Sequence, residues 1–221
     1  MSAAARETGL IIAVDGPAAS GKGTLAAGLA RHYGLAHLDT GLLYRAVGRA
    51  VAGLEAAPDF EARAIAAAQA VDAALLDAEQ LSSGEIGQMA SKVAVISGVR
   101  QALFDMQRQF ALRPGGAVLD GRDIGTRIAP DADVKLFIRA DSKARMERRA
   151  RQFEARGLPV DRYALYHQIE ERDARDSANP YGGFYPAPDA HLLDTTLLDI
   201  EAALRAAVAI VDRVTGSQAR P

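Results

Sequence analysis

A short apolar segment that runs into a glycine-rich loop is the feature that most constrains this chain. Residues 10–14 are LIIAV, and an apolar run bounded by a turn signal is typical of a buried strand. The following residues, GPAASGKGT at 16–24, have the Gly-x4-Gly-Lys spacing of a phosphate-binding loop. Glycines let backbone N–H groups approach a phosphate closely, and Lys22 and a helix start add positive charge. The sequence therefore predicts a strand, loop and helix that bind a nucleoside triphosphate.

The loop departs from the usual pattern at one position. A Ser or Thr normally follows the lysine directly, whereas here Gly23 intervenes and Thr24 supplies the hydroxyl one residue later. The alternative is an ordinary glycine-rich turn, but strand, loop, lysine and helix are all in register, which favours phosphate binding. The predicted ATP-binding residues are Gly16, Pro17, Ala18, Ala19, Ser20, Gly21, Lys22, Gly23 and Thr24.

Composition excludes several classes of protein. The net charge of the 221 residues is −2, so no overall basic field indicates nucleic-acid binding. The absence of cysteine excludes disulfides, thiolate metal sites and cysteine nucleophiles. Residues 1–9 lack an apolar core and are expected to form a tail rather than a signal peptide. Without a run of about 18 apolar residues, no membrane span is expected, and a cytoplasmic location follows by default.

Further along the chain, predicted strands alternate with predicted helices. Strands are expected at 35–38, 117–119, 134–138 and 191–194, and helices from 22, 42, 58–59, 141–142, 162 and 199 onward. A longer helix is expected over 88–111 with a bend near 97–98, after a polar turn at 81–87. The alternation predicts an α/β domain whose parallel sheet has helices on both faces. Thr40 is expected either to cap a helix or to touch a ligand at a strand end.

Arginine placement extends the prediction from binding to a reaction. Phosphoryl transfer needs positioning and charge neutralisation, and a cluster of Arg122, Arg172 and Arg175 near Lys22 would supply both. A salt-bridged helix end is the alternative for 171–176. Most arginines between 148 and 156, and the cations Lys92, Arg100 and Arg108, fit solvated helix faces. No Asn/Thr-Lys-x-Asp guanine signature is present, which counts against a GTPase.

Six motifs together carry a family resemblance. They are GPAASGKGT at 16–24, LDTGLLYR at 38–45, ASKVAVISGVR at 90–100, DGRDIGT at 120–126, ERDARD at 171–176 and DAHLLDTT at 189–196. This set resembles bacterial cytidylate kinases over residues 10–214. The resemblance implies a three-layer P-loop NTPase-type fold with a five-stranded parallel sheet, in one domain over 10–215 with tails at 1–9 and 216–221. It further implies a helical monophosphate-binding region near 50–111, a lid near 148–190, and a monomer.

The resemblance also implies an activity, namely transfer of the γ-phosphoryl group of ATP to CMP or dCMP with Mg²⁺. Catalytic roles would fall to Lys22, Arg122 and Arg172, and Thr24 would lie near the metal. The resemblance implies that Ser91, Arg100 and Asp123 read the base. These residue types suit cytosine, which offers an amino donor to a carboxylate and acceptors to Arg and Ser. The full implied CMP site comprises Thr40, Tyr44, Arg45, Ser91, Arg100, Asp120, Arg122, Asp123, Arg172 and Asp176.

Two positions depart from the family pattern. Ser82 and Asn179 stand where the family normally has arginines, and Gly183-Phe184 replaces a Pro-Leu pair. Losing a charge-assisted contact with a phosphate costs about 1.5–3 kcal/mol if nothing compensates. Two alternatives to CMP phosphorylation therefore stay open at this point: a P-loop kinase with another acceptor such as UMP, and a nucleotide-binding protein with impaired transfer.

Overall fold

A computed structural model describes residues 9–81, 83–179 and 185–216. Ser82, Gly183, Phe184 and most of both predicted tails lie outside the described residues. No helix of the described part is both long enough and apolar enough to cross a membrane.

The centre of the described chain is a parallel sheet with the order β2-β3-β1-β4-β5. Its strands are β1 (Ile11–Asp15), β2 (Ala36–Asp39), β3 (Ala117–Gly121), β4 (Val134–Arg139) and β5 (His191–Asp194). The apolar run at the start of the loop motif forms β1, which pairs with β3 on one side and β4 on the other. Every residue of β1 is buried, which explains why this strand is apolar without alternation. The prediction of a five-stranded parallel sheet is confirmed.

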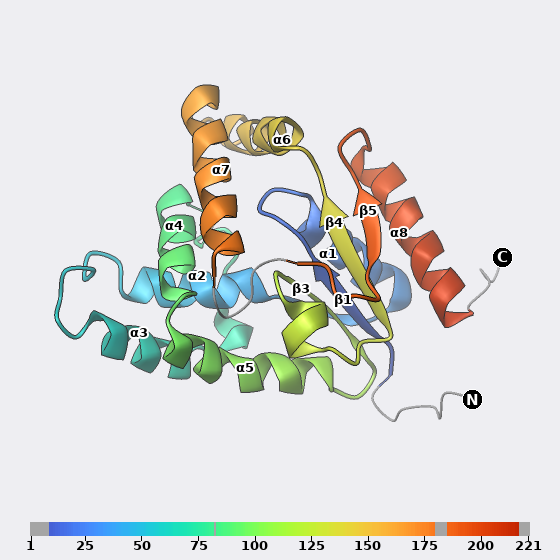
Figure 1. Ribbon diagram of the computed structural model, residues 1–221, viewed down its shortest axis with the longest axis horizontal. Coiled ribbons are helices and arrows are strands. Elements are labelled where there is room, and N and C mark those ends of the chain that lie inside the picture. The colour runs from blue at the N-terminus through green and yellow to red at the C-terminus, as the bar shows by residue number, and fades with distance from the viewer. Residues whose placement is uncertain (1–8, 82, 180–184, 217–221) are drawn as a thin grey trace.

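Helices cover both faces of this sheet (Figure 1). On one face, α1 (Lys22–Tyr33) and α8 (Ile200–Thr215) pack against side chains of β1 and β4 such as Val14 and Leu136. On the other, α2 (Thr40–Ala50), α3 (Phe60–Gln69) and α5 (Ser97–Ala111) enclose a second apolar cluster that contains Ile11 and Leu119. The two clusters are the interfaces of a three-layer α/β fold.

Sequence and structure differ most between α2 and α5. The predicted turn at 81–87 ends early, because Ser83 caps α4 (Gly84–Val93) by accepting a hydrogen bond from the Ile86 N–H at 3.2 Å. The single bent helix over 88–111 is instead two helices, separated by residues 94–96.

Thr40 is not a cap, since the side chain of Asp39 accepts the N–H of Gly41 and Thr40 is the first residue of α2. A short 3-10 turn, η1 (Ala73–Leu75), follows α3.

A helical hairpin stands above the carboxyl ends of the strands (Figure 1). It comprises α6 (Ser142–Glu154) and α7 (Arg162–Ser177), which pack through a small apolar cluster around Met146, Leu165 and Ile169. Asp141 and Asp161 cap the two helices through hydrogen bonds to backbone N–H groups. A π-type turn, η2 (Ile124–Ile128), follows β3 below the hairpin. This hairpin occupies most of the predicted lid region, whose role as a moving lid stays a prediction.

Candidate nucleotide-binding site

A pocket of about 360 Å³ lies at the carboxyl ends of β1, β2 and β3, beneath α6 and α7. Open parallel sheets bind ligands at this edge, where the loops after neighbouring strands converge. Of the predicted site residues, the pocket is lined by Ala18, Ala19, Gly21, Lys22, Gly23, Thr24, Thr40, Tyr44, Arg45, Ser91, Arg100, Asp120, Arg122, Asp123, Arg172 and Asp176. Gly16, Pro17 and Ser20 do not line it. The structure thus brings segments from across the whole chain to one cavity.

The phosphate loop has the backbone that its glycines permit. Gly16 has φ 152°, and a Cβ there would lie 2.1 Å from the Ile138 carbonyl oxygen, so only glycine fits. Gly21 has φ 91° directly before α1. Ala19, with φ 58°, is the non-glycine residue of the described chain in the left-handed region, a conformation that costs about 1–2 kcal/mol and marks a constrained loop.

Two arginines of α6 hold this loop from outside. Arg145, which is buried, donates from Nη1 to the Ala18 carbonyl at 3.1 Å and from Nη2 to Asp173 on α7. Arg148 donates from Nη1 to the Ser20 carbonyl at 3.0 Å and from Nη2 to the Thr195 carbonyl. The expectation that the arginines from 148 to 156 are mostly solvated is therefore wrong for Arg148. It is also wrong for Arg149, which lines the pocket and whose pKa is lowered to about 10 by burial, whereas Arg151 and Arg156 are exposed. No local spacing signals these contacts, because their partners lie far away in sequence.

The Lys22 ammonium lies among like and unlike charges. Burial, and then the nearby Arg122 guanidinium, lower the pKa of Lys22 from 10.5 to about 8, while Asp120 and Asp39 act in the opposite direction. The cations Lys22, Arg122 and Arg172 lie close enough together to repel one another, and an anionic ligand placed between them would relieve this repulsion. This end of the pocket is therefore prepared for phosphate groups.

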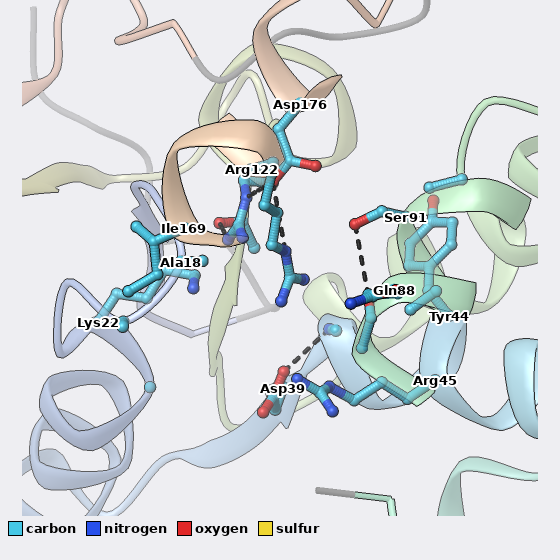
Figure 2. A pocket seen from close by; sticks show the side chains of 18 of the residues that line it. Ala18, Lys22, Asp39, Tyr44, Arg45, Gln88, Ser91, Arg122, Ile169 and Asp176 are labelled. Carbon is cyan, nitrogen blue, oxygen red and sulfur yellow. Dashed lines mark hydrogen bonds and ion pairs between the residues drawn. The ribbon is translucent and has the colours of Figure 1, made fainter. Parts of the chain in front are cut away.

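Two arginines near Lys22 come from distant parts of the chain, Arg122 directly after β3 and Arg172 on α7, and Figure 2 shows Arg122 beside its partner Asp176. Arg122 donates from Nε to the Asp176 carboxylate at 2.9 Å and from Nη1 to the Gly16 carbonyl at 2.9 Å. Arg172 lies 3.8 Å from the same carboxylate oxygen, and burial followed by repulsion from Arg122 lowers the pKa of Arg172 to about 10. Arg122 and Arg172 therefore lie near Lys22, as the sequence predicts, and Arg175 also lines the pocket.

Two carboxylates lie side by side at the ends of neighbouring strands. Asp39 of β2 pairs in register with Asp120 of β3. Burial, and then the Asp120 charge, raise the pKa of Asp39. His37 contacts the Asp120 carboxylate at 2.8 Å, and Thr40 donates to the Asp120 carbonyl at 2.8 Å. The His37 ring is thus held by a hydrogen bond to Asp120.

The opposite end of the pocket contains a buried ion pair. Arg100 of α5 donates from Nη2 to Asp123, and both side chains are almost fully buried. Burial raises the pKa of Asp123 although Arg100 acts to lower it. Arg100 also lies over the Tyr44 ring, 5.9 Å from its centroid, and its buried Nε has no hydrogen-bond partner among the described residues. The expectation of a solvated Arg100 is wrong, because α5 turns this residue toward the cavity rather than toward water.

Arg45 and Ser91 reach the pocket from α2 and α4. Arg45 donates to the carbonyl oxygens of Leu81 at 2.7 Å and Ser83 at 3.3 Å, while its guanidinium points toward Asp39 (Figure 2). The Ser91 hydroxyl is directed into the cavity (Figure 2) and is 3.5 Å from the Gly87 carbonyl. Asn179, at the end of α7, donates from Nδ2 to the Ala94 carbonyl at 3.2 Å and so connects α7 with the end of α4.

Comparison with known proteins decides the family. The sequence model described as cytidylate kinase matches residues 12–213. The chain belongs to the cytidylate kinase family. It is 54% identical to a cytidylate kinase of Methylocella silvestris over 92% of this chain and 94% of that one. It is 51% identical to a cytidylate kinase of Rhodopseudomonas palustris over 96% of this chain and all of that one.

Solved structures support the fold alone. An uncharacterized protein from Eubacterium ventriosum superposes with a TM-score of 0.53 at 16% identity, covering 92% of this chain and 98% of that one. The family model and the two cytidylate kinases, and not this structure, confirm the family resemblance inferred from the six motifs.

Nucleotides commonly bind together with Mg²⁺, so the oxygen atoms in the pocket matter as potential ligands of this metal. Among the described residues no group of three or more His, Cys, Asp or Glu side chains could hold a metal ion. The Thr24 hydroxyl and the carboxylates of Asp39 and Asp120 nevertheless supply hard oxygen atoms beside Lys22. Mg²⁺ prefers oxygen ligands and commonly takes several from substrate phosphates, so these residues fit a metal that arrives with the triphosphate.

Proposed function

We propose that this pocket transfers the γ-phosphoryl group of ATP to CMP or dCMP, giving ADP and CDP or dCDP. The observation that carries the proposal is the division of one cavity into a cationic end around Lys22 and another end around the buried Arg100–Asp123 pair. Family membership supports the same activity, since the named relatives are cytidylate kinases.

In the proposed reaction, an oxygen of the acceptor monophosphate forms a bond to the γ-phosphorus. The bond from the γ-phosphorus to the β,γ-bridging oxygen breaks, and ADP leaves with that oxygen. Lys22, Arg122 and Arg172 supply positive charge around the transferred group, which is the main need of a loose phosphoryl-transfer transition state. The phosphate monoester is already anionic, so no general base is required.

The acceptor is read by the groups at the other end. Cytosine presents an exocyclic amino donor and the acceptors O2 and N3. Asp123 can accept from the amino group, while Arg100 and Ser91 can donate to the acceptors. Thr40, Tyr44 and Arg45 lie between the base and the phosphates. Asp176, which is paired with Arg122, is the proposed partner of the sugar hydroxyls.

The α6–α7 hairpin is proposed to exclude water, which protects ATP from hydrolysis. Mg²⁺ would be held mainly by the ATP phosphates, with Thr24, Asp39 and Asp120 as the nearby oxygen ligands. When bound, the metal supplies charge neutralisation on the triphosphate. A monomeric state and a cytoplasmic location stay predictions.

The test is ADP release with Mg-ATP and, in separate assays, CMP, dCMP, UMP and AMP. Fast turnover on CMP and dCMP is expected. Turnover chiefly on UMP or AMP would retain a kinase and reject the proposed base site, and ATP binding without product on any acceptor would reject transfer altogether.

Asp123→Asn sharpens the base assignment. We expect kcat/KM for CMP to fall by roughly 10- to 100-fold, because the variant weakens a buried charge-assisted contact, and the preference for CMP over UMP to narrow. The matched control is Asp131→Asn, which disrupts another ion pair of α5, with Arg108, outside the pocket. Equal preference for CMP in both variants would remove Asp123 from base recognition.

A further inference from the structure

The carboxylate of Asp15, at the end of β1, is buried at the base of the site and has no role in the steps above. The residue is 4% exposed. Its two oxygens accept backbone N–H groups of the turn η2, with Oδ1 2.9 Å from the Ile124 nitrogen and Oδ2 2.8 Å from the Gly125 nitrogen. These two residues come directly after Asp123.

The position of this contact matters because sheet pairing ends there. The register between β1 and β3 runs to Asp15 and Gly121 and goes no further. Beyond that pair, Arg122 and Asp123 are no longer held by the ladder of strand hydrogen bonds. The carboxylate of Asp15 takes over this connection by holding the backbone directly after Asp123, and the Gly16 carbonyl accepts a hydrogen bond from Nη1 of the Arg122 side chain. Two consecutive residues at the start of the phosphate loop therefore contact the segment that carries Arg122 and Asp123.

The contact is closely packed and energetically demanding. A Cβ on Gly125 would lie 3.4 Å from Oδ2 of Asp15 and 3.2 Å from a side-chain carbon of Lys135, so the turn has little freedom to move. Burial raises the pKa of Asp15 to about 7 despite the two N–H donors. A buried carboxylate is an unfavourable choice where stability alone is required. Its advantage here is geometric, because it accepts two adjacent N–H groups at once.

We propose that Asp15 is a positioning residue, which fixes the turn after Asp123 and thereby sets the base-reading Asp123 and the phosphate-binding Arg122 in register with the phosphate loop. The proposal rests on the proposed function, since the register matters only if donor and acceptor nucleotides meet in this cavity. It assigns to Asp15 no contact with substrate. Its effect reaches the acceptor through Arg122 and Asp123.

The decisive variant is Asp15→Asn. Asparagine has the same shape, but its amide offers one acceptor oxygen and one NH2 donor, so one backbone N–H of the turn meets a donor instead of an acceptor. We expect KM for CMP to rise roughly 10-fold and the preference for CMP over UMP to fall, which corresponds to one unsatisfied buried group. KM for ATP is expected to stay within about 2-fold, because the phosphate loop keeps its other contacts.

A second measurement is independent of turnover. Amide hydrogen exchange of the ligand-free protein should show faster exchange at Ile124 and Gly125 in Asp15→Asn than in the wild type. Asp133→Asn is the matched control. Asp133, like Asp15, accepts a backbone N–H, but its donor is Ile11 at 2.9 Å, at the opposite end of β1 and outside the pocket. The control is expected to leave KM for CMP and exchange at the turn unchanged.

Gly125→Ala provides a second route if Asp15→Asn does not fold. The added methyl group presses on Lys135 and the Asp15 carboxylate and displaces the turn without altering that carboxylate's chemistry. A smaller rise in KM for CMP is expected, again with little change for ATP.

The outcome that would overturn the positioning role is loss of stability alone. In that case, the variant that folds, Asp15→Asn or Gly125→Ala, would have a lower melting temperature but an unchanged KM for CMP and an unchanged preference for CMP over UMP. If the wild type itself turns over no CMP, the proposed function fails. Exchange at the turn then still reports whether Asp15 holds it.

Discussion

The two ends of the pocket are built in different ways. The proposed donor end depends mainly on one continuous segment, from β1 through the phosphate loop to Lys22, to which Arg122 and Arg172 add positive charge from distant parts of the chain. The acceptor end gathers single side chains from α2, α4, α5 and the turn after β3. A locally encoded end is recognisable in any chain that carries the motif. An end assembled from distant residues can change its specificity through a few substitutions, which is how one fold serves different acceptors.

The largest expected effect tests whether the donor end is indispensable. Lys22→Ala removes a charge placed beside the transferred group, and we expect kcat to fall by roughly 100- to 1000-fold or more. Steady-state assays with CMP check this, with Lys143→Ala, an exposed lysine at the start of α6, as the control. Unchanged turnover in Lys22→Ala would contradict the mechanism and the division of the pocket on which it rests.

An intermediate effect tests how local the donor end really is. Arg148→Ala removes the hydrogen bond to the Ser20 carbonyl of the phosphate loop, and we expect ATP to bind roughly 10-fold more weakly with little change in KM for CMP. Titration calorimetry with ATP measures the first quantity. Arg151→Ala, a change at an exposed arginine of the same helix, should alter neither. If Arg148→Ala weakened ATP binding and raised KM for CMP by the same factor, α6 would support the whole pocket and not one end.

The smallest effect concerns protons. Because the pKa of Lys22 is lowered to about 8, the free protein at pH 8 carries this lysine about half protonated, and bound triphosphate favours the charged form. ATP binding should therefore take up roughly half a proton at pH 8 and much less at pH 7. Calorimetry in two buffers of different ionisation enthalpy detects the uptake. Lys22→Arg, which stays protonated, should abolish it, and an uptake that persists in this variant would place the titrating group elsewhere.

Prediction from sequence succeeds where the determinants are local. The strand, glycine-rich loop and helix at 10–34 follow from neighbouring residues, and the alternation of elements is sufficient to predict the parallel sheet and its two helical layers. The caps that set helix starts are less predictable, because Asp39 and Ser83 are polar residues among many others and only the folded backbone selects them.

The acceptor end and the supports of the phosphate loop are harder to predict. Arg100 and Arg148 have the helical spacing of solvated charges, and only tertiary packing turns one toward Asp123 and the other toward Ser20. The family resemblance assigned Arg100 to the cytosine end, but nothing in the sequence signals Arg145 or Arg148. The role of Asp15 cannot be predicted for a related reason. Its position directly before the glycine-rich loop does not indicate its hydrogen-bond partners, which are the backbone N–H groups of residues 124 and 125.

One support of the phosphate loop, Thr195, is synthesised long after the loop itself. Its hydroxyl lies 3.1 Å from the Ser20 carbonyl and from Nη1 of Arg148, although 175 residues separate Thr195 from Ser20. On the ribosome, the loop is therefore made near the start of translation and receives this support only near the end. A nascent chain that stops before β5 contains the complete ATP-binding motif without its last support. We therefore expect a nascent chain to bind ATP more weakly before Thr195 has been added than after the full chain has folded.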